Sequence, residues 1–140
     1  MAGSVTHNGV VSSPLFLGGE FLCYHRTMIY LRSRRCVPCE VGGPPFSAEE
    51  IVVLRKQIPK WDVVNNHELK RKFKCKNFAE ALAFVNKVGA LAESEGHHPD
   101  IRFGWGYVEL TLFTHAVGGL SENDFILAAK IDRLHTNKNA

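Results

Sequence analysis

The sequence lacks the signatures of several large classes of protein. No apolar run approaches the roughly 20 residues that a membrane-spanning helix needs, so we expect no membrane association. No glycine-rich loop has the spacing of a dinucleotide-binding or P-loop motif. Cys36 and Cys39 form a single Cys-x-x-Cys pair, and no second pair follows to complete a zinc finger. Cys23 and His25 could supply two further ligands, but free thiols in a loop are the simpler interpretation. We therefore expect no metal and no cofactor.

Acidic residues are almost absent from residues 1–35, which carry four arginines against Glu20 alone. This Arg- and Ser-rich composition, without a sustained apolar period, is typical of an organelle transit peptide and equally of a disordered tail. We expect a flexible N-terminal extension, with a mitochondrial or plastid location if it is a transit peptide and a cytoplasmic location otherwise. The rest of the chain balances thirteen basic and thirteen acidic residues, so we expect no binding of nucleic acid.

Residues 36–140 have the composition and patterning of one globular domain. Capping patterns predict three helices, which begin at Ser47, Asn77 and Ser121. Alternating apolar residues predict four strands over residues 61–64, 69–75, 101–103 and 107–114. The order is therefore α-β-β-α-β-β-α. Because consecutive strands with short links form antiparallel hairpins, we expect an α+β fold: a four-stranded antiparallel sheet with three helices packed on one face.

Histidines gather at two predicted element ends. His97 and His98 follow the second helix, with Glu93 one turn earlier, and His115 follows the last strand. Imidazole can both donate and accept a proton near neutral pH, so a pocket at these ends would suit proton-transfer chemistry on a small molecule. The remaining histidines are expected to lie outside this site: His7, His25, His67 and His135.

The run from Glu93 to Asp100, with Thr114-His115 and then Gly118-Gly119-Leu120-Ser121, resembles the pterin-4a-carbinolamine dehydratase family. The resemblance covers roughly residues 36–135. It implies dehydration of a 4a-hydroxytetrahydropterin to a quinonoid dihydropterin and water, a step in the recycling of tetrahydrobiopterin. No metal and no covalent intermediate is implied. The site residues that it implies are catalytic His97, His98, His115 and Glu93, and substrate-binding Pro99, Asp100, Thr114 and Gly118.

Within that set we expect His97 and His115 to be the acid–base pair and His98 to position the substrate. Glu93 is expected to orient His97, and Asp124 to begin the third helix and to hold residues 116–121. The resemblance also implies a homodimer or homotetramer. Two alternatives stay open: a metal-dependent hydrolase that uses the same histidines and Glu93, and a non-catalytic interaction module such as a transcriptional dimerisation cofactor.

Overall fold

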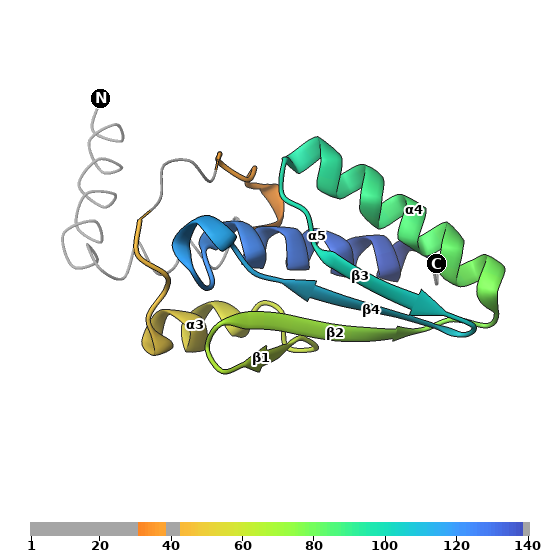
Figure 1. Ribbon diagram of the computed structural model, residues 1–140, viewed down its shortest axis with the longest axis horizontal. Coiled ribbons are helices and arrows are strands. Elements are labelled where there is room, and N and C mark those ends of the chain that lie inside the picture. Colours follow the sequence, from red (N-terminus) through yellow and green to blue (C-terminus); the bar gives the residue numbers. More distant parts are fainter. Residues whose placement is uncertain (1–30, 39–42, 139–140) are drawn as a thin grey trace, which may run out of the picture. The chain divides into compact units, whose positions relative to one another are not determined.

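The computed structural model describes residues 31–38 and 43–138. These residues belong to one compact unit, which begins at Leu31 (Figure 1). Cys23, His25 and Cys39 lie outside the described residues. So does most of residues 1–35, the segment to which the transit-peptide prediction applies. Leu31, which lies four residues before the domain boundary expected after residue 35, is fully buried within the core. It opens the short 3-10 helix η1 (Leu31–Ser33), which lies against α5.

The four strands that the structure describes form a single antiparallel sheet in the order β1-β2-β4-β3. Their bounds are β1 (Asp62–Val64), β2 (Glu68–Lys74), β3 (Asp100–Gly104) and β4 (Tyr107–Leu112). β4 occupies the interior of the sheet, and its alternate residues Val108, Leu110 and Leu112 are completely buried. This is the face that the alternation pattern assigned to the helices, so the α+β prediction is confirmed.

Three helices cover the buried face of the sheet: α3 (Ala48–Arg55), α4 (Phe78–Glu95) and α5 (Glu122–Lys138) (Figure 1). The predicted starts are confirmed for the first two. The Ser47 hydroxyl accepts from the backbone N–H of Glu50, and the Glu50 carboxylate accepts from the N–H of Ser47. The Asn77 side chain accepts from the N–H of Glu80 in the same way. Each of these bonds satisfies a backbone donor that a helix start leaves unpaired.

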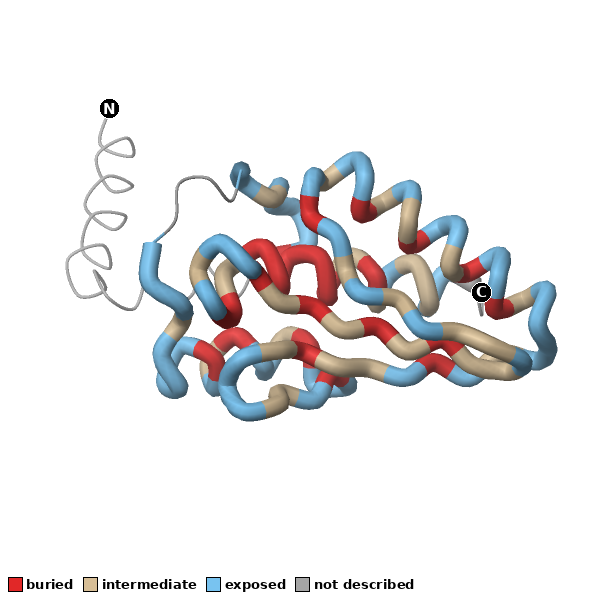
Figure 2. The backbone as a smooth tube through the Cα atoms, in the orientation of Figure 1, coloured by how far each residue is buried: buried red, intermediate tan, exposed pale blue. Residues whose placement is uncertain are grey.

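The core lies between the sheet and the helices, and it is most continuous along α5 (Figure 2). Seven consecutive residues of α5, numbers 123–129, are buried. A helix buried all round packs against neighbours on more than one side. α5 contacts both α4 and η1, so its first turn is enclosed by the rest of the fold. Asp124 lies in that turn, and its carboxyl side chain has no exposed surface.

The chain departs from the predicted strand after Leu112. β4 ends there, and residues 115–117 form a second 3-10 helix, η2 (His115–Val117). Thr114 forms an isolated antiparallel bridge to Gly119, which closes the loop on itself. Gly118 has a φ of 68°, and a Cβ added to Gly119 would lie 3.0 Å from Cβ of Pro45. The glycine pair is thus needed for a left-handed turn and for a close approach.

Candidate active site

His97 is placed by the end of α4. Gly96 ends the helix in a left-handed conformation, with a φ of 65°. The backbone N–H groups of Gly96 and His97 donate to the carbonyls of Glu93 and Ala92. Glycine adopts this conformation without the strain that a Cβ brings. The chain therefore turns sharply at Gly96 and directs the His97 side chain into the protein, where it is only 5% exposed.

Asp124 holds the buried His97 ring. Its Oδ1 lies 2.7 Å from Nε2 of His97. Its Oδ2 accepts hydrogen bonds from the Thr114 hydroxyl, at 2.8 Å, and from the backbone N–H of Ser121, at 2.9 Å. Because Thr114 donates to Asp124, the hydroxyl of Ser121 is the donor in the 2.7 Å contact between Thr114 and Ser121. One carboxylate thus joins the end of α4, the loop after β4 and the start of α5.

This arrangement also determines the tautomer of His97. Asp124 receives donors on both oxygens, so Nε2 is the ring nitrogen that carries the proton. In the neutral ring, Nδ1 is then the nitrogen without a proton. The expectation that Asp124 begins the third helix and holds the loop before it agrees with the bond to Ser121. Its contact with His97 was not expected from the sequence.

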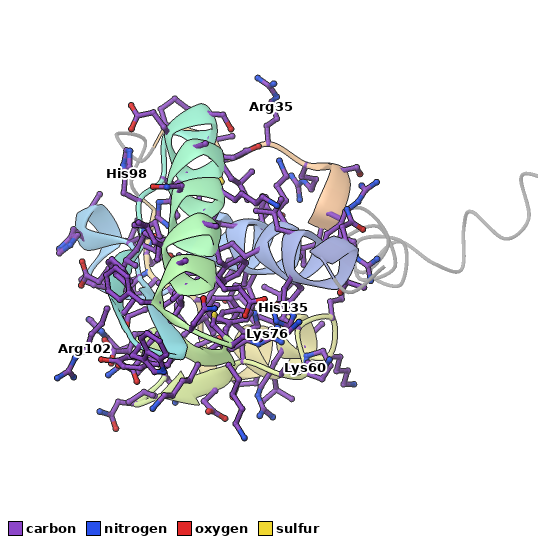
Figure 3. The ribbon with its side chains drawn as sticks, turned by 90° about the vertical axis from the view of Figure 1, so that its right-hand side faces the viewer. Arg35, Lys60, Lys76, His98, Arg102 and His135 are labelled. Carbon is purple, nitrogen blue, oxygen red and sulfur yellow. The ribbon has the colours of Figure 1, made fainter. Side chains whose placement is uncertain are left out.

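His98 lies at the surface (Figure 3), whereas its neighbour His97 is buried. Its Nε2 is 2.9 Å from Oε2 of Glu93, and both side chains are largely exposed. The expected pairing of Glu93 with His97 is therefore replaced by a pairing of Glu93 with His98. The reason is the turn at Gly96, which carries His97 inward and leaves His98 on the side of the helix where Glu93 is exposed. An exposed pair of this kind contributes little to stability, so its value would lie in orienting the imidazole.

His115 opens η2 and is exposed. Its ring centroid lies 4.2 Å from that of Phe113, and the Phe113 ring lies 5.7 Å from the ring of His67. His67 follows the turn at Asn65 and Asn66, both of which have a positive φ. His67 directly precedes β2, and the pairing of Leu69 with Leu112 brings it beside the end of β4. His67 is the residue near the site that sequence reasoning placed outside it.

The four residues expected to bind substrate have different environments. Thr114 is 2% exposed and bonded to Asp124, so it belongs to the buried network. Pro99 is half-buried, whereas Asp100 and Gly118 are exposed. Asp100 begins β3 and pairs with Thr111 of β4. All four lie at the same end of the β3–β4 pair. Thr114 is the one of the four that is buried.

Two other polar residues, His135 and Lys70, lie away from this site and contact neighbouring side chains of the fold. His135 packs against the rings of Phe73 and Phe84, at the opposite end of α5 from Asp124. Lys70 pairs with Glu68 at 2.9 Å on the open face of the sheet, as expected for a solvated strand face. Among the described residues, no group of three or more His, Cys, Asp or Glu side chains is arranged to hold a metal ion. In the same part of the chain, no helix is both long and apolar enough to cross a membrane.

Cys36 is half-buried, and its thiol lies 3.7 Å from the carbonyl oxygen of Asn123. Burial raises the pKa of this thiol to about 12, and the nearby Glu95 carboxylate adds to the effect. A thiol reacts as a nucleophile or metal ligand through its thiolate. Cys36 is therefore held in its unreactive form, which argues against a redox role for this cysteine.

Comparison with known proteins identifies the family. The model for pterin 4 alpha carbinolamine dehydratase matches residues 44–134, which contain His97, His98, His115 and Asp124. The chain belongs to the pterin-4-alpha-carbinolamine dehydratase family. A relative from Rubrobacter xylanophilus is 55% identical over 107 residues, which are 76% of this chain and all of the relative. A relative from Alkaliphilus metalliredigens is 52% identical over 104 residues, or 74% of this chain and 94% of the relative. Both carry the name pterin-4-alpha-carbinolamine dehydratase as a provisional assignment.

A solved member of the dehydratase family has the same fold. It is a crystal structure from Brucella melitensis, described as a transcriptional coactivator/pterin dehydratase. The TM-score is 0.61 at 27% sequence identity, and the match covers 64% of this chain and 97% of the Brucella chain.

Proposed function

We propose that the protein dehydrates 4a-hydroxytetrahydropterin to quinonoid dihydropterin by histidine acid–base catalysis. The single observation that carries this proposal is the buried carboxylate of Asp124, which holds His97 through Nε2 and reaches Thr114, the residue before His115. The Asp124 carboxylate therefore positions the His97 imidazole directly. Through Thr114 it also positions the loop that carries His115. Family membership supports the substrate class.

The reaction needs two proton transfers. The bond from C4a to the hydroxyl oxygen breaks, and an acid protonates that oxygen so that it leaves as water. A base removes the proton of the adjacent ring nitrogen, and a carbon–nitrogen double bond forms. Imidazole side chains placed for these transfers contribute roughly 10²–10⁴-fold each. We assign the transfers to His97, through Nδ1, and to the exposed His115. His98, oriented by Glu93, positions the substrate.

The test is a dehydratase assay on the purified full-length protein, with and without a chelator. We expect acceleration over the spontaneous reaction in both conditions. A folded preparation that is inactive would overturn the assignment and favour an interaction module. Dehydratase activity that a chelator abolishes and a metal ion restores would instead show that the site works through a bound metal, which contradicts catalysis by the histidines alone.

Assembly into a dimer or tetramer is part of the same proposal. β1 and β3 are the edge strands of the sheet, so their outer backbone groups have no partner strand among the described residues. The apolar side chains of Phe78 and Leu82 on α4 are 45% and 40% exposed. A second copy would cover these groups. Light scattering should give two or four times the chain mass, unchanged by a reducing agent, and a fully active monomer would contradict the assembly.

A further inference from the structure

Residues 31–38, here called the N-terminal strap, lie beside the two helix ends that carry His97 and Asp124. Figure 1 shows this segment, in orange, between α5 and the end of α4 that leads into β3. The strap precedes residue 44, where the match to the family model begins. The roles implied by family membership therefore leave it without an assigned function.

Its hydrogen bonds and ion pair with α5 fall on the two residues that precede Asp124. The Asn123 side chain accepts from the N–H of Val37 at 3.0 Å and donates to the Val37 carbonyl at 2.7 Å. This paired contact imitates one rung of a β-ladder, so it defines both the position and the direction of the strap. Arg34 forms an ion pair with Glu122. Leu31, fully buried in the core, anchors the beginning of the strap.

Its contact with α4 falls on Glu95, two residues before His97. The N–H of Cys36 donates to Oε2 of Glu95 at 3.0 Å, and Oε1 of Glu95 accepts from Lys130 of α5. The Glu95 and Lys130 side chains are only 8% and 17% exposed. Burial alone would raise the pKa of Glu95, but these two hydrogen bonds lower it overall. The strap, most of whose residues are themselves exposed, therefore ties together the end of α4 and the start of α5.

We propose that the N-terminal strap is a positioning element of the active site, with Asn123 as its central residue. The inference rests on the proposed function. The two atoms of the 2.7 Å contact between His97 and Asp124 belong to different helices, so their geometry depends on how those helix ends are held. The strap bonds to residues one or two positions from each of them. Loosening it would let the helix ends separate without removing any group that touches the substrate.

The experiment uses the full-length chain and two variants that break the same contact from opposite sides. Asn123→Ala removes the side chain from α5, and Val37→Pro removes the N–H from the strap. The matched control is Asn77→Ala, which removes one hydrogen bond of comparable length at the far end of α4. It lowers stability through a lost helix cap but leaves the active-site ends of α4 and α5 intact.

We expect Asn123→Ala and Val37→Pro each to lower kcat about tenfold, because small displacements of a catalytic group are costly, with KM little changed. The double variant should resemble the single variants, since one contact cannot be lost twice. Asn77→Ala should lower the melting temperature without lowering kcat. If the strap variants also lower only the melting temperature, the strap is a stabilising element and the proposal is wrong.

A second readout separates this proposal from the proposed function. The imidazole ¹⁵N signals of His97 report its hydrogen bond to Asp124, whatever reaction the protein catalyses. They should shift in Asn123→Ala and Val37→Pro and stay in place in Asn77→Ala. An inactive wild-type protein with shifted signals in the strap variants would refute the dehydratase and retain the strap. Unchanged signals would refute the strap. If Asn123→Ala does not fold, Val37→Pro decides alone, because Val37 is 62% exposed and its replacement disturbs no core packing.

Discussion

Replacing Asp124 with asparagine tests the central contact of the site. The carboxylate accepts three hydrogen bonds, from His97, Thr114 and Ser121. An asparagine has one acceptor oxygen and one NH₂ group. The backbone N–H of Ser121 cannot become an acceptor, so the amide oxygen must face Ser121 and Thr114, and the NH₂ must face His97. Nε2 of His97 then has to accept, and the ring proton moves to Nδ1.

The magnitude follows from that exchange. Nδ1, which carried no proton in the neutral ring, becomes the protonated nitrogen, so the proton transfer assigned to His97 is lost. We expect kcat to fall about 10²–10⁴-fold, the usual contribution of a positioned acid or base. Replacing a charge-assisted hydrogen bond with a neutral one should also cost about 1–3 kcal/mol of stability. Turnover is measured in the dehydratase assay, and folding by circular dichroism in denaturant.

Asp132→Asn is the matched control. It is the same substitution eight residues later in α5, at a carboxylate that holds two partners, the indole of Trp61 and the guanidinium of Arg71. It should reduce stability and leave kcat close to the wild-type value. A variant Asp124→Asn with wild-type kcat, or an equal loss of kcat in Asp132→Asn, would refute the assignment of Asp124 as the group that orients His97.

Three further predictions follow. His97→Ala and His115→Ala should mainly lower kcat, whereas His98→Ala should mainly raise KM, and equal effects on both constants in steady-state kinetics would contradict these roles. A chain beginning at Leu31 should keep full stability in denaturant, but one beginning at Cys36 should lose about 1.5–3 kcal/mol, because a buried leucine is removed; equal stability of the two would refute the boundary at Leu31. Iodoacetamide at pH 8 should alkylate folded Cys36 at least about tenfold more slowly than the unfolded chain, as peptide mass spectrometry would show, because its pKa is raised to about 12. The folded state should then lose stability as the pH rises above about 9.0, the ordinary value, because the unfolded chain releases that proton first.

Local patterns determined most of the fold. The caps at Ser47 and Asn77 mark helix starts because their side chains bond to backbone groups three residues away, and such short-range contacts can be read from spacing alone. Gly96 marks the helix end for the same reason, as a residue suited to a left-handed turn. The alternation in β4 identified the face that packs under the helices, because successive strand residues point to opposite sides. The motif around His97 and His98, with Thr114-His115, was sufficient to indicate the family.

Contacts between distant segments were decided only by the tertiary structure. The pairing of Glu93 was predicted wrongly, because spacing places both histidines near it and only the turn at Gly96 determines which one points inward. Asp124 was expected to serve its own helix, and no sequence pattern showed that it would meet His97, 27 residues earlier. Leu31 looked like part of the N-terminal extension because residues 1–35 have no sustained apolar period. Whether such a residue is buried depends on the surface that the rest of the chain presents to it, and here α5 presents that surface.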